Sequence, residues 1–85
     1  MGGLLLSRQR HAEAEKVYRQ AIAHERFSEE AHRGLMRSQE ALGESGRALR
    51  HYEELVGMLE EQLGASPASE TSELYERLRE GRSGE

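Results

Sequence analysis

The sequence predicts an all-α domain built from stacked antiparallel helical hairpins. Apolar residues recur at helical spacing, valine, isoleucine and threonine are scarce, and no window alternates with the period of a β-strand. A group of small and aromatic residues also returns after 34 positions (48 − 14, 52 − 18 and 55 − 21), as Ala14, Tyr18 and Ala21 and then Ala48, Tyr52 and Leu55. This period is typical of two-helix repeats, whose stacked hairpins bury each other's apolar faces.

About five helices are expected, and two of them precede Phe27. A short segment over Gly3 to Arg8 is the remainder of a truncated opening helix, because subtracting 34 from Leu35 leads to Met1. We therefore expect the chain to be a fragment of a longer protein. The second helix spans about Ala12 to Glu25, and its apolar face carries Ala14, Val17, Tyr18, Ala21 and Ile22.

The third helix begins at Ser28, a residue type favoured at the N-cap, with Glu29 and Glu30 in the first turn, where carboxylates stabilise the helix dipole. It extends to about Leu42, and Gly43 ends it.

The fourth helix spans about Ser45 to Leu63 and ends at Gly64, with an apolar stripe along its length. Gly57 inside it costs about 1 kcal/mol relative to alanine, so a close backbone approach or a bend is expected there. A short linker with the only proline, Pro67, leads to a fifth helix over about Ser69 to Glu80. Residues 1–80 should form a single domain, and residues 81–85 a disordered tail.

Composition argues against several classes of protein. The 85 residues include no cysteine, and all 16 acidic residues are glutamate, which excludes thiolate chemistry and Asp-rich calcium loops. Arginine and glutamate alternate and the net charge is −4, whereas nucleic-acid binding requires a basic stripe. The leucine run at residues 4–6 is far too short to span a membrane. We expect a cytoplasmic protein that contacts neither membrane nor, through this segment, nucleic acid.

The histidines are the candidate metal ligands or general bases. None lies three or four residues from another, so no helix presents two on one face; they are His11, His24, His32 and His51. No glycine elbow accompanies a serine that could act as a nucleophile. We expect no catalytic residue, metal site or cofactor, and no enzyme activity.

Two segments have a distinctive sequence. Residues 30–37 read EAHRGLMR, and residues 61–78 read EQLGASPASETSELYERL. They resemble the E-A-A-H-R-x-L-M-R and E-L-G-x-x-P-S-P-E-T-x-x-L-Y-x-x-L patterns of the bacterial transcriptional activator domain, the tetratricopeptide-like helical domain of antibiotic-regulatory-protein-type regulators. Gln62 is additional here, and Ala68 and Ser69 replace the usual Ser-Pro. The resemblance covers about Ala12 to Leu78.

The resemblance implies a non-catalytic domain for protein–protein interaction or dimerisation in a bacterial transcriptional regulator. In that family the helical domain usually follows a winged-helix domain, so the parent protein would bind DNA elsewhere. The 34-residue repeat alone is equally typical of a general tetratricopeptide adaptor or scaffold module. A winged helix upstream in the parent gene would favour the first function, and further 34-residue repeats the second.

One candidate partner-binding face lies on the third expected helix. Its members share the register set by the repeat and are Glu30, Arg33, Arg37 and Glu40. Arg33 and Arg37 are four residues apart, so their guanidinium groups could clamp a carboxylate of a partner peptide. The alternative is that both arginines pair with glutamates of their own helix, and we favour that alternative.

A candidate self-association face lies near the N-terminus. Because most of the opening helix is missing, the second helix should leave part of its apolar side uncovered. The leucine run is expected to cover part of this side and a second copy of the chain the rest, giving a homodimer. The face comprises Leu4, Leu5, Leu6, Val17, Tyr18 and Ile22.

Overall fold

The computed structural model describes residues 3–83, and the side chains of residues 7–81. Four helices account for most of this range, and no strand occurs within it, which confirms the all-α class. The helices are α1 (Gly3–His24), α2 (Glu29–Ala41), α3 (Ser45–Leu63) and α4 (Ser69–Ser83).

The expected number of about five helices was one too high. The two segments expected before Phe27 are parts of one continuous helix, α1. The residues between them, 9–11, are polar but include neither glycine nor proline, so nothing interrupts the backbone hydrogen bonds there. At the other end, α4 continues to Ser83 rather than stopping at Glu80, and residues 84–85 lie outside the described part.

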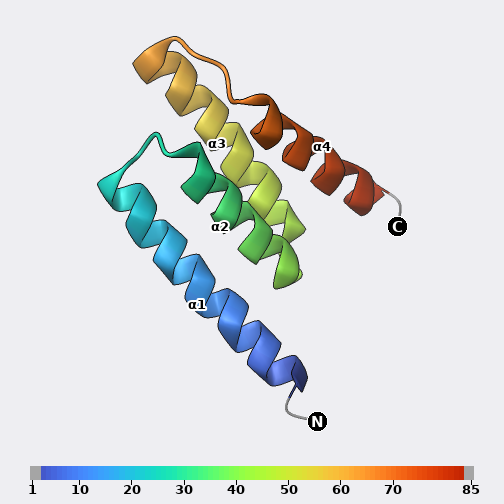
Figure 1. Cartoon of the computed structure of the whole chain (residues 1–85). Coiled ribbons are helices and arrows are strands. Elements are labelled where there is room, and N and C mark those ends of the chain that lie inside the picture. Colours follow the sequence, from blue (N-terminus) through green and yellow to red (C-terminus); the bar gives the residue numbers. More distant parts are fainter. Residues whose placement is uncertain (1–2, 84–85) are drawn as a thin grey trace.

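Successive helices run antiparallel and pack side by side (Figure 1). The centre of the arrangement is α2, which contacts α1 on one side and both α3 and α4 on the other. Each helix therefore contacts the next one along the chain, as the repeat pattern predicts, and α4 also contacts α2.

Local sequence fixes the ends of the helices. The Ser28 hydroxyl accepts a hydrogen bond from the Ala31 amide, which confirms Ser28 as the N-cap of α2. Gly43 and Gly64 end α2 and α3 with φ of 78° and 60°, a left-handed conformation that glycine adopts without steric cost. After Gly64, the Ala65 amide donates to the Leu59 carbonyl and closes the end of α3.

The core lies where α2, α3 and α4 meet. Its central cluster consists of Met36, Ala48, Leu74 and Leu78, each at most 4% exposed. Tyr52 of α3 and Tyr75 of α4 pack against this cluster with their rings stacked, 4.2 Å between centroids. Ala48, which recurs 34 positions after Ala14, is fully buried in this cluster.

Two residues of the expected apolar faces point outward. Val17 of α1 is 60% exposed and Leu63 at the end of α3 is 54% exposed. Val17 belongs to the edge of the α1 face, whereas Tyr18 and Ile22 are half-buried. Leu63 lies in the last turn of α3, so it borders the linker rather than the core.

One glycine marks the closest approach between α1 and α2. The ring of Tyr18 lies directly on the backbone of Gly34, and a methyl group added at Gly34 would overlap the ring. Gly34 is itself buried in α2. At Gly57 of α3, where a close approach or a bend was expected, an added methyl group would meet no neighbouring atom within 4 Å.

Candidate protein-interaction sites

The contact between α2 and α4 is a chain of hydrogen bonds centred on Thr71, whose side chain is fully buried. The Thr71 hydroxyl donates to Glu29 Oε1 at 2.7 Å and accepts from Arg33 Nη1 at 3.0 Å. Glu29 also accepts from the Ala68 amide at 2.8 Å, and Arg33 faces Glu70 at 3.8 Å. Two side chains from the first part of α2 thus hold the N-terminal end of α4.

This contact separates the residues of the expected partner-binding face. Arg33 is 14% exposed and is engaged with α4, an arrangement that neither the clamp nor pairing within its own helix anticipated. Arg37 is exposed and borders a groove of about 350 Å3 with Glu70, Glu73, Leu74 and Arg77 of α4. Glu30 and Glu40 are exposed. A clamp by both arginines stays a prediction.

The expected self-association face is also divided. Val17 is open to solvent, whereas Tyr18 and Ile22 are half-buried against the rest of the domain. The side chains of Leu4, Leu5 and Leu6 lie outside the described residues. Self-association through this face stays a prediction.

Two histidines meet across the α2–α3 hairpin. His32 Nδ1 and His51 Nε2 are 2.8 Å apart, and His32 Nε2 is 2.7 Å from the Arg26 carbonyl oxygen. Because that carbonyl can only accept, His32 Nε2 carries a proton, and when both rings are neutral His51 Nε2–H donates to His32 Nδ1. This leaves the lone pair of His51 Nδ1 without a partner among the described residues.

Spacing within a single helix, the criterion applied to the histidines above, does not reveal this pair. His32 and His51 lie on opposite sides of the Gly43 turn, on helices that the hairpin places antiparallel. A search across the turn could have found them. Among the described residues, no three histidine, cysteine, aspartate or glutamate side chains converge on a metal-sized site.

Burial, and to a smaller extent the neighbouring charges of His32 and Arg19, together lower the pKa of His51 from 6.5 to about 4. The unfolded chain takes up this proton near pH 6.5, but the folded chain does so only near pH 4. The contribution of neutral His51 to the free energy of unfolding is therefore complete above pH 6.5, and it is lost as the pH falls toward 4.

Between pH 6.5 and pH 4, the free energy of unfolding should fall more in the wild type than in His51→Gln, by about 1–2 kcal/mol. This difference is smaller than the full pKa shift implies, because His51 is partly accessible to solvent. Urea unfolding followed by circular dichroism at several pH values measures this difference. His24→Gln, at an exposed position of α1, is the control and should keep the wild-type slope. If the free energy of unfolding depends on pH equally in wild type and His51→Gln, the pKa of His51 is not lowered as described.

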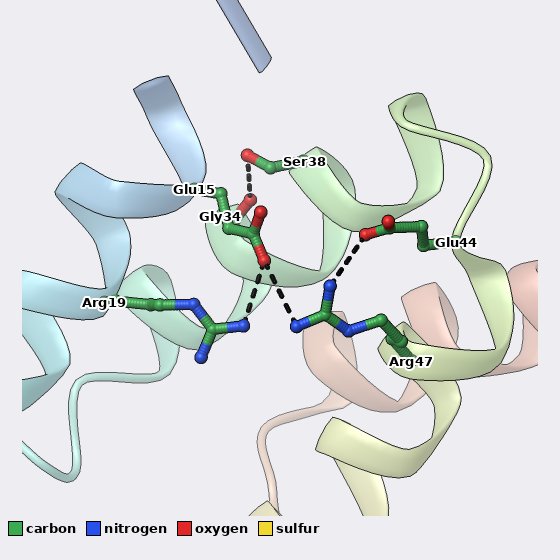
Figure 2. A network of polar contacts seen from close by, with 6 residues as sticks. All are labelled: Glu15, Arg19, Gly34, Ser38, Glu44 and Arg47. Carbon is green, nitrogen blue, oxygen red and sulfur yellow. Dashed lines mark hydrogen bonds and ion pairs between the residues drawn. The ribbon is translucent and has the colours of Figure 1, made fainter. Parts of the chain in front are cut away.

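A polar network crosses from α1 to α3 over α2 (Figure 2). Glu15 of α1 accepts from Arg19 at 2.9 Å and lies 3.8 Å from Arg47 of α3. Arg47 in turn pairs with Glu44 at 3.0 Å. The Glu15 side chain is only 14% exposed, so its carboxylate is held between two guanidinium groups where solvent screening is reduced.

A family model described as the bacterial transcriptional activator domain matches residues 1–79, nearly the whole chain. No curated protein sequence and no solved structure matches significantly. In the described part of the chain, no helix is both long and apolar enough to cross a membrane.

Proposed function

Because the chain belongs to the bacterial transcriptional activator domain family, we propose that it is a non-catalytic interaction domain of a bacterial transcriptional regulator, and that it associates with a second copy of itself. In this proposal the DNA is bound by another part of the parent protein, since the net charge here is −4 and the charges are interleaved. A domain with this role works in the bacterial cytoplasm.

The observation that carries the proposal is the length of α1. With 22 residues α1 is about 33 Å long, whereas α2, with 13 residues, is about 20 Å long. The N-terminal part of α1 therefore extends past α2 (Figure 1). Residues 7–10 in this projecting part are all exposed. A projecting helix whose sequence continues into three leucines favours packing against another chain.

The family match favours this function over a general adaptor. The match extends from residue 1 to residue 79, so it includes the linker and α4 as well as the 34-residue repeat. A general helical-repeat adaptor would account for the repeat but not for the sequence of residues 61–78.

Val17→Glu should weaken self-association at least about tenfold, because it places a charge on the exposed apolar edge of α1. Size-exclusion chromatography with light scattering over a range of concentrations gives the dimer fraction. Ala23→Glu is the matched control, since Ala23 is exposed on the same helix about 120° further round. A strictly monomeric wild type at all concentrations would contradict self-association.

A further inference from the structure

A polar hollow of about 200 Å3 lies beside the network of Figure 2, between α1 and α3. We refer to it as the arginine hollow. It is lined by Arg19 of α1, Gln39 of α2, and Arg47, Arg50, His51 and Glu54 of α3. At about 30 Å3 per water molecule, it has room for one side chain with its peptide group, but not for a helix.

The charged groups of the arginine hollow favour an anionic ligand. Three of its lining side chains are arginines and one, Glu54, is acidic, while His51 is neutral near pH 7. Arg50 forms no ion pair or side-chain hydrogen bond with any described residue. Arg19 and Arg47 already face the Glu15 carboxylate, and Arg47 also pairs with Glu44, so a ligand carboxylate has to share these two guanidinium groups, while Arg50 is left to pair with the ligand.

Gln39 supplies a second, independent indication of a ligand. It is 3% exposed, yet its Oε1 atom is buried and has no hydrogen-bond partner. No other buried side-chain nitrogen or oxygen in the described part is left in this state. Such groups are normally paired, and Gln39 is one of the residues that line the hollow, so a ligand bound there could supply the partner once the amide turns toward it.

The amide of Gln39 favours a peptide over a phosphate. Its Oε1 requires an N–H donor, and if the amide is turned over, its NH2 group requires a C=O acceptor. A peptide bond offers both groups, whereas a phosphodiester or a fully ionised phosphate offers only acceptors. We propose that the arginine hollow binds an acidic side chain of an extended segment of a partner protein, with the carboxylate at Arg19, Arg47 and Arg50 and the adjoining peptide group at Gln39.

This inference rests on the proposed interaction role but not on self-association. The test is an NMR titration of the wild-type domain with the blocked peptide acetyl-Gly-Glu-Gly-Glu-Gly-amide and its glutamine counterpart. The titration uses a protein concentration at which light scattering has established the oligomeric state of the domain. Saturable amide shifts around Gln39 and Arg50 are expected for the glutamate peptide, with a Kd roughly tenfold or more below that of the glutamine peptide.

Three variants locate the site. Arg50→Ala should raise the Kd about tenfold, and Arg79→Ala, at an exposed arginine of α4, should leave it unchanged. Glu15→Gln should lower the Kd, because the competing carboxylate is lost. Gln39→Leu should raise the Kd while the urea midpoint stays equal or increases, since the unpaired amide is removed.

Several results would overturn the proposal. It is wrong if no saturable shift appears at millimolar peptide, or if both peptides bind equally. Inorganic phosphate or a short DNA duplex that shifts the same amides as strongly would make the hollow a general anion site instead. Loss of binding in Arg79→Ala to the same degree as in Arg50→Ala would show that net charge, not the hollow, causes the effect.

Discussion

Replacing Leu78 with alanine is expected to lower the free energy of unfolding by about 2–5 kcal/mol. Leu78 is 2% exposed and belongs to the cluster that joins α4 to α2 and α3. Truncation removes its contacts and leaves a cavity that the surrounding helices fill only partly. A domain of this size has a total stability of only about 4–13 kcal/mol, so the loss is a large share.

Urea unfolding followed by circular dichroism measures the effect of Leu78→Ala. Leu63→Ala removes the same atoms from a side chain that is 54% exposed, and it should change the stability by less than about 1 kcal/mol. If Leu78→Ala does not fold, Leu78→Met keeps the volume and should cost under about 1.5 kcal/mol. Equal effects of the two alanine substitutions would contradict the position of Leu78 in the core.

Gly34→Ala is expected to destabilise the domain by about 1–2 kcal/mol, although alanine is the better helix former by about 1 kcal/mol. The added methyl group would overlap the Tyr18 ring, so α1 must move away from α2 or the ring must leave its site. Gly57→Ala is the matched control. Its methyl group meets no atom within 4 Å, so the same substitution should stabilise by about 1 kcal/mol.

The opposite signs of Gly34→Ala and Gly57→Ala are the result to test, again by urea unfolding. A double-mutant cycle with Tyr18→Ala assigns the cause, because Gly34→Ala should lose its penalty once the ring is absent. If Gly34→Ala stabilises the domain as Gly57→Ala does, the close contact between Tyr18 and α2 is not as described.

The helix ends and the centre of the core could be predicted from the sequence, because local features determine them. Ser28 caps α2, Gly43 and Gly64 end their helices, and Ala48 is buried where the repeat places it. Ser28, Gly43 and Gly64 act through local backbone geometry, and Ala48 is identified by its spacing of 34 residues from Ala14. The error at Val17 arose because a single helix does not show how wide its buried face is.

The side-chain contacts between helices could not be predicted in the same way. The hydrogen bond from Arg33 to Thr71 joins residues 38 positions apart, and the one between His32 and His51 joins residues 19 positions apart. Both depend on how the helices are rotated about their axes relative to each other. Charge alternation predicted that Arg33 would be paired, but it could not identify the partner. The orphaned amide of Gln39 likewise follows from packing alone.

The central position of α2 has a consequence for how the domain opens. Within residues 3–83, α1 and α4 each pack against α2 and do not contact each other. Either outer helix can therefore detach while the other stays folded, so the amides of α1 and α4 should exchange with solvent deuterium through separate local openings. The amides of α2 are covered from both sides and should exchange last, at the rate of global unfolding.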